Sequence, residues 1–232
     1  MQETVIRGKT LTFVLFAVMM LLSIHFQRQQ QEEALATNAL EETTADAGLK
    51  RVALTFDDGP HPVYTKILLD GLKERGVKDT FFVIGKNISV REEIIRQMAE
   101  DGHLIGNHTY DHADISNMSS DAACEELKKT SDLIEEITGN STAYVRAPFG
   151  RWDDALDCMV SMISVRWTVD PLDWTTKNKS QIVSKVVTDV ADNDIILLHD
   201  YYKSSVEAAL EIIDILQKRG FEFVTVEDLL LD

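Results

Sequence analysis

The chain has 232 residues with a formal net charge of −16, and 44% of its residues are hydrophobic. Such an acidic chain excludes nucleic acid as an expected partner, because phosphate binding requires a basic face. The hydrophobic share excludes global disorder and allows a sizeable core, so one large domain or two small ones are expected.

An apolar run near the N-terminus predicts a membrane segment. Leu11–Phe26 carries no acidic residue and follows the cations Arg7 and Lys9. We expect residues 1–26 to form a cytoplasmic stub and an uncleaved transmembrane signal-anchor, which makes the protein a single-pass cell-membrane protein with its bulk outside the cytoplasm. The alternative is a secreted protein, released by cleavage of a signal peptide near Ala34–Ala36.

Residues 27–48 are polar and rich in Gln, Glu, Thr and Ala, a composition that is typical of a tether. The remaining residues, 49–232, are expected to form a single domain. Both cysteines, Cys124 and Cys158, fall within it. An exported chain could pair them, and the sequence leaves open whether it does.

From Lys50 onward, short strand-type runs alternate with longer helix-type runs. Strands are predicted at Val52–Phe56, Thr80–Ile84, His103–Gly106, Ala143–Arg146, Val165–Val169, Ile195–Leu198 and Phe221–Val226. Helices are predicted at Val63–Arg75, Arg91–Asp101, Ser120–Thr138, Asp153–Ser161, Ser180–Ala191 and Ser204–Arg219. This alternation predicts an α/β fold with a parallel sheet and right-handed crossovers. About seven repeats favour a barrel or near-barrel over a small open sheet.

Polar side chains follow five of the seven predicted strands. In parallel α/β folds, chemistry takes place on the loops after the strand C-termini, which meet at one mouth. The residues concerned are Asp57, Asp58, His108, His112, Arg146, Asp170, Asp173, Trp174, His199 and Asp200.

His108 and His112 stand four residues apart, a workable spacing for two imidazoles on one metal ion. Alone, such a pair is more often a surface accident, but one added carboxylate completes a ligand set with open positions for water and substrate. Asp57 and Asp58 repel each other, and a cation beside them would relieve that repulsion. One would ligate the metal while the other faced an open position. The residues alone leave open which does which, and an acidic β-turn is the alternative interpretation.

Five motifs resemble, in order and rough spacing, those of the polysaccharide deacetylase family, also called the NodB-homology family or carbohydrate esterase family 4. They read TFDDGP, HTYDH, RAPFG, DPLDW and LLHD. The resemblance covers about residues 50–230 and implies that residues 49–232 are a polysaccharide deacetylase catalytic domain. It also implies a distorted (β/α)7-type barrel, in agreement with the alternation above.

The resemblance implies a metal centre. Asp58, His108 and His112 would hold one divalent ion, usually zinc, with cobalt, manganese or nickel as alternatives. Asp57 would act as the general base toward water, and Arg146 would orient it.

The remaining motifs imply the other half of the site. His199 would be the general acid that protonates the leaving amine, and Asp173 would support it. The backbone N–H of Phe149 would stabilise the oxyanion. Trp174 and Leu197 would wall the acetyl pocket.

One motif departs from the family pattern. The third usually reads Arg-Pro-Pro-Tyr, whereas here it is Arg146-Ala147-Pro148-Phe149. Backbone donation to an oxyanion survives this change, but a hydroxyl contact to sugar does not. The departure indicates an altered substrate preference.

The expected function is a metal-dependent hydrolase that removes N-acetyl groups from a cell-surface polysaccharide, either peptidoglycan or chitooligosaccharide. An O-acetyl esterase of the xylan type and a non-catalytic glycan-binding protein that keeps the fold are the alternatives. The expected partners are an N-acetylated glycan and, through the anchor, the membrane.

Overall fold

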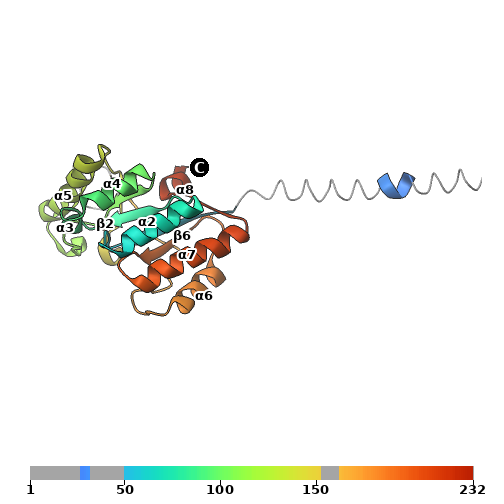
Figure 1. Ribbon diagram of the computed structural model, residues 1–232. Helices are drawn as coiled ribbons and strands as arrows, with labels where there is room; N and C mark the ends of the chain where they lie inside the picture. Colours follow the sequence, from blue (N-terminus) through green and yellow to red (C-terminus); the bar gives the residue numbers. More distant parts are fainter. Residues whose placement is uncertain (1–26, 32–49, 153–161, 232) are drawn as a thin grey trace, which may run out of the picture. The chain divides into compact units, whose positions relative to one another are not determined.

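The computed structural model of the protein describes residues 27–31, 50–152 and 162–231 (Figure 1). The chain divides into two compact units, Met1–Gly48 and Leu49–Asp232. In the first unit, residues 27–31 are helical. Within the described ranges, no helix combines the length and the apolar character that a membrane crossing requires. The predicted anchor and most of the predicted tether lie outside the described residues.

The described residues of the second unit form a seven-stranded sheet in the order β5-β4-β3-β2-β1-β6, with β7 paired to β1. Every strand pair is parallel, as the alternation predicts. The bounds are β1 Lys50–Asp57, β2 Thr80–Val83, β3 Leu104–Asn107, β4 Tyr144–Val145, β5 Ile163–Ser164, β6 Asp194–His199 and β7 Phe221–Phe223.

Helices cover the outside of this sheet. They are α2 Tyr64–Arg75, α3 Gly85–Ile88, α4 Glu92–Glu100, α5 Ser120–Thr138, α6 Lys179–Asp189, α7 Lys203–Lys218 and α8 Val226–Leu231. Figure 1 shows α2, α7 and α6 next to one another, and α7 contacts both of the others. A second group joins α5 to α3 and α4. Short 3-10 turns occur at Ile115–Asn117 and Pro148–Gly150.

The central strand β1 separates two hydrophobic layers. Val52, Leu54 and Phe56 lie in the larger cluster, which also contains Leu68 of α2 and Ile212 of α7. Because successive side chains of a strand point to opposite faces, these three residues face the helices and the residues between them face the interior.

The interior changes from apolar to polar along β1. Ala53 packs inside in a smaller cluster with Phe82, Tyr144, Val165, Ile195 and Val226. Thr55 and Asp57 point the same way as Ala53 by the same alternation, and both accept hydrogen bonds from Arg146. The C-terminal end of the interior is therefore the charged end.

The predicted strand Val165–Val169 is wrong as a regular strand, since β5 is Ile163–Ser164 and Val169 forms an isolated bridge to Ile196. Val165 N–H donates to Val145 O at 2.8 Å, whereas Val169 O accepts from Leu197 N–H at 3.0 Å. This segment therefore runs from β4 to β6. The sheet curls into a parallel half-barrel, which is consistent with the predicted (β/α)7-type fold.

One further predicted strand differs from the structure, and one predicted helix lies outside the described residues. The predicted strand Phe221–Val226 is too long, because β7 ends at Phe223 and α8 begins at Val226. Thr225 and Asp228 form a reciprocal cap, in which each side chain accepts from the other's backbone N–H at 3.1 or 3.2 Å. The predicted helix Asp153–Ser161 lies outside the described residues.

The described cysteine, Cys124, is disulfide-bonded. The sequence leaves this pairing open. The other cysteine of the sequence, Cys158, lies outside the described residues.

Candidate active site

The two aspartates at the end of β1 face different groups. The strand register places Asp57 beside His199 of β6. At Asp58 the backbone turns into the left-handed region, with φ of 73°. This change of conformation re-aims the second side chain. A non-glycine residue in this region is uncommon and marks functional sites. Both carboxylates still lie near His108 Nε2, at 3.8 Å for Asp57 Oδ2 and 3.4 Å for Asp58 Oδ1.

Asp57 is held by a buried arginine. Nη1 of Arg146 donates to Asp57 Oδ1 at 2.8 Å and to Thr55 Oγ1 at 2.7 Å. The guanidinium lies 4.2 Å from the centre of the Phe82 ring, and Arg146 is 1% exposed. Burial lowers the pKa of Arg146, and the charge of Asp57 opposes that shift. Such a pair costs desolvation free energy, and the hydrogen bond from Arg146 fixes the orientation of the carboxylate.

His108 follows β3 directly and is buried. Its Nδ1 lies 2.7 Å from the backbone oxygen of Arg146. A carbonyl oxygen only accepts, so Nδ1 carries the proton and Nε2 keeps its lone pair for another partner. This arrangement is typical of a histidine that binds a metal ion.

His112 reaches the same place by a loop, and not by a helical turn. Thr109 and His112 both adopt left-handed backbone conformations, with φ of 62° and 58°. The rings of His108 and His112 lie 5.0 Å apart, centre to centre. Burial lowers the pKa of His112, which favours the neutral imidazole that a metal ligand must be.

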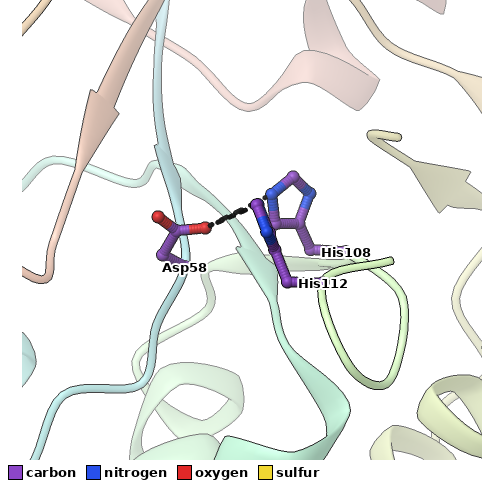
Figure 2. Close-up of side chains that lie close together, drawn as sticks. All are labelled: Asp58, His108 and His112. Atoms are coloured by element: carbon purple, nitrogen blue, oxygen red, sulfur yellow. Dashed lines mark ion pairs between the residues drawn. The ribbon is translucent and has the colours of Figure 1, made fainter. Parts of the chain in front are cut away.

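The predicted ligand set converges on one point (Figure 2). Oδ1 of Asp58 lies 3.4 Å from His108 Nε2 and 3.3 Å from His112 Nε2. One ligand atom from each residue fits within 4.8 Å of the others. Two ligands on a tetrahedral ion, each about 2.0–2.1 Å from it, stand about 3.3 Å apart. Asp58 Oδ1 is also buried without a hydrogen-bond partner, so these residues fit a divalent ion.

The carboxylates of Asp57 and Asp58 favour a positive charge beside His108. Burial lowers the pKa of His108, but the charges of Asp57 and Asp58 outweigh burial, and the net shift is upward. A proton or a metal ion would relieve the two carboxylates in the same way.

His199 is fixed by a buried carboxylate. Its Nδ1 lies 2.8 Å from Asp173 Oδ1, and its backbone N–H donates to Asp173 Oδ2 at 2.9 Å. Burial lowers the pKa of His199, but the hydrogen bond and charge of Asp173 outweigh burial and raise the pKa to about 9. The imidazole is therefore protonated at neutral pH, and its Nε2 is the nitrogen left for the cleft.

These groups surround a cleft of about 440 Å³. Of the residues expected at the mouth, Arg146, Asp173 and Asp200 are buried and do not line it. The other predicted residues that line it are Asp57, Asp58, His108, His112, Phe149, Trp174, Leu197 and His199. Residues that the motifs did not assign complete the wall, namely Ala147, Gly150, Trp167, Asp170, Leu172 and Tyr202.

The third motif forms one edge of the cleft. Phe149 is in the left-handed region with φ of 62° and is 62% exposed. Its ring lies 4.9 Å from the ring of His112 in an edge-on arrangement. A bulky residue in this conformation is strained, and such strain is found where backbone groups must face a ligand.

A comparison with known families decides the assignment. A family model described as polysaccharide deacetylase matches residues 44–163, just over half of the chain. The chain belongs to the polysaccharide deacetylase family. The resemblance inferred from the five motifs is thereby confirmed.

Curated relatives and solved structures match a larger share of the chain than the family model does. The peptidoglycan-N-acetylmuramic acid deacetylase PdaC of Bacillus subtilis is 37% identical over 202 residues, which are 87% of this chain and 43% of that protein. A solved structure of PdaC aligns with a TM-score of 0.76 and 39% identity, over 79% of this chain and 91% of that one.

Two further relatives differ in their substrates. A chitooligosaccharide deacetylase of Bradyrhizobium is 35% identical over 194 residues, covering 76% of this chain and 89% of the relative. The structure of an acetyl xylan esterase from Clostridium thermocellum, in complex with a cobalt ion, aligns with a TM-score of 0.73 and 36% identity, over 78% and 90% of the two chains. The chain spans less than half the length of the first curated relatives that it matches.

Two side chains to which the motifs assigned no role hold the loop between His108 and His112 in place. Oε2 of Glu126, on α5, accepts from the backbone N–H groups of Tyr110 and Asp111 at 3.0 and 2.8 Å. The buried side chain of Asn107 accepts from Thr109 N–H at 2.8 Å and donates to Leu127 O at 2.7 Å. The one sequence signal was an acidic residue on the buried stripe of a predicted helix.

Replacing Glu126 with alanine is expected to lower metal affinity about 10-fold to 100-fold, the range found when groups that hold ligands in place are removed. The two N–H groups that Glu126 accepts from lie between His108 and His112, so their release loosens the distance between the imidazoles. Zinc titration of the metal-free protein measures the effect.

Glu125→Ala is the matched control, because the neighbouring Glu125 is exposed and forms a surface pair with Lys129 at 2.8 Å. It should leave zinc affinity unchanged. Equal affinities in both variants would remove the positioning role of Glu126.

Proposed function

We propose that this protein is a metal-dependent hydrolase that removes N-acetyl groups from a polysaccharide, either peptidoglycan or chitooligosaccharide. One observation carries the proposal. The three metal-fitting side chains share a cleft with an arginine-bound carboxylate and a carboxylate-bound, protonated histidine. Two curated relatives that are named peptidoglycan and chitooligosaccharide deacetylases support the choice of substrate.

Asp58, His108 and His112 would hold the ion. Two imidazoles and one carboxylate suit zinc and leave positions open, and cobalt, manganese or nickel are the alternatives. Bound there, a divalent ion supplies positive charge that polarises an acetyl carbonyl and acidifies water.

The chain's own groups would move the protons. Asp57, oriented by Arg146, accepts a proton from the attacking water as general base. His199, held by Asp173, then gives its proton to the leaving amine, which yields acetate and a free amino sugar.

Three further residues would position the acetamide. The backbone N–H of Phe149 donates to the developing oxyanion. Trp174 and Leu197 form the walls around the acetyl methyl group, since both line the cleft.

An O-acetyl esterase is the second candidate, because the acetyl xylan esterase aligns with this chain at a similar score. The same water-activating groups would serve ester cleavage, but the alcohol leaving group of an ester depends less on a protonated donor than the amine of an amide does. The salt-bridged His199, with its pKa raised to about 9, favours the amide. The same histidine and the complete ligand set argue against a non-catalytic glycan-binding protein.

The proposed location is the outer side of the cell membrane. Residues 1–26 would anchor the chain and residues 27–48 would tether the catalytic domain, with release by signal-peptide cleavage as the alternative. The apolar run and the cations before it support this location.

Acetate release tests the proposed function. The purified chain with added zinc is expected to release acetate from N-acetylglucosamine oligomers or from purified peptidoglycan, and more slowly from acetylated xylan. Acetate release from xylan alone would make the protein an esterase. Tight binding to the oligomers without release of acetate would make it a glycan-binding protein.

A further inference from the structure

A second hollow of about 390 Å³ adjoins the active-site cleft. Tyr202 lines both cavities. Three tyrosines and three lysines face the second cavity, which we call the tyrosine–lysine hollow: Tyr64, Tyr201, Tyr202, Lys177, Lys179 and Lys203. Its volume falls within the range of about 300–1,000 Å³ that is usual for ligand pockets.

Aromatic rings lead from the catalytic centre into this hollow. The ring of His199 lies 6.4 Å from that of Tyr202, and Tyr202 lies 5.9 Å from Tyr201. Tyr201 then meets His61 at 5.0 Å, and His61 stacks on Tyr64 at 4.4 Å. Such rings offer flat apolar faces at low conformational cost, so a glycan bound in the cleft can extend along them.

The hollow also gathers positive charge in a chain whose net charge is −16. Lys203 pairs with Glu207, which faces the hollow as well, and Lys179 pairs with Glu211 at 2.7 Å. Among the described residues, Lys177 has no carboxylate within ion-pair distance. Two of the three lysines are therefore balanced by glutamates, and within the part of the chain that the structure describes Lys177 leaves one unpaired positive charge at the hollow. An anion is favoured there more than over the acidic remainder of the chain.

We infer that the tyrosine–lysine hollow is a subsite for a sugar unit that carries a carboxylate, next to the N-acetyl group in the cleft. This inference rests on the proposed function and narrows it. Peptidoglycan offers such a group on the lactyl ether of muramic acid units that carry no stem peptide, and at the end of the stem peptide on the other units, whereas chitooligosaccharides are neutral. The hollow therefore selects acidic polymers.

Three substrates that differ in charge test the subsite. They are a peptide-free peptidoglycan tetrasaccharide with lactyl carboxylates, the same tetrasaccharide with these groups converted to methylamides, and neutral chitotetraose. The wild-type chain is expected to show a KM for the carboxylated form about threefold to tenfold below that for the methylamide, with similar kcat. A form that retains the stem peptide shows which carboxylate is recognised.

Lys177→Glu should abolish this preference. It is expected to raise KM about threefold to tenfold for the carboxylated substrate only, and less so at high salt. Lys128→Glu makes the same charge change on α5, where the exposed Lys128 pairs with Asp132, and should alter no KM. An equal KM change on all three substrates, or no preference in the wild type, would overturn the inference.

Failure of the proposed function is a separate outcome. If no substrate releases acetate, calorimetric binding of the carboxylated and methylamide tetrasaccharides still tests the hollow. A Kd ratio that Lys177→Glu reduces to unity supports the subsite, and equal Kd values in the wild type contradict it.

Discussion

Asp58→Ala is expected to lose its metal ion and, with it, all acetate release. Asp58 Oδ1 lies 3.4 Å from His108 Nε2 and 3.3 Å from His112 Nε2. Its removal leaves two ligands and takes away the negative charge that balances a dication. Metal affinity should fall by more than the roughly 100-fold that loss of an outer supporting group can cost. Zinc content per chain after dialysis, measured by atomic emission, checks this result.

Asp57→Asn is the matched control at the neighbouring position. The amide keeps the size of the side chain and leaves the three ligands in place, so zinc should remain bound. Turnover should fall about 10²-fold to 10⁴-fold, because an amide cannot accept the proton of water. A full complement of zinc in Asp58→Ala, or its loss in Asp57→Asn, would reverse the roles of the two carboxylates.

His199→Ala is expected to slow acetate release about 10²-fold to 10⁴-fold while zinc stays bound. The leaving amine would then depart without a proton donor, since Nε2 of His199 is the acid group that faces the cleft beside Asp57. Single-turnover rates on an N-acetylglucosamine oligomer, together with zinc content, separate this effect from metal loss. A near-normal rate would remove the role of general acid.

The dependence of kcat on pH gives a second test of the His199–Asp173 pair. The pKa of His199 is raised to about 9, so its acid form is present below that pH and is lost as the pH rises through it. Among the groups that raise this pKa, Asp173 has the largest effect, and Asp173→Asn should therefore move the basic limb of the kcat profile to lower pH. An unchanged limb in Asp173→Asn would show that another group controls it.

A helix with a capping residue at each end was predictable from the sequence. The predicted helix Ser120–Thr138 has the bounds of α5, because an N-terminal serine and a following glycine mark its ends. Ser119 accepts from Ala122 N–H, and Gly139 adopts φ of 74°. Short strands were harder, since the two residues of β5 are defined by their pairing with β4 and not by their own composition.

The convergence of the site was also predictable, because parallel strands bring their C-terminal ends to one edge. Asp57 and His199 stand in register on neighbouring strands, and the loop after β3 adds the two histidines. What the sequence could not supply was the path of that loop. Residues with left-handed backbone conformations determine this path, together with Glu126. Glu126 lies 16 positions beyond Tyr110 in the sequence, so the two residues meet only in the folded chain.

The most direct test of the account is metal removal and restoration in the wild-type chain, with acetate release as the readout. After treatment with a chelator, the protein should release no acetate from an N-acetylglucosamine oligomer. One equivalent of zinc per chain should restore the full rate, and further zinc should add nothing. A metal-free protein that releases acetate at the untreated rate would contradict the claim that Asp58, His108 and His112 hold an ion on which the reaction depends.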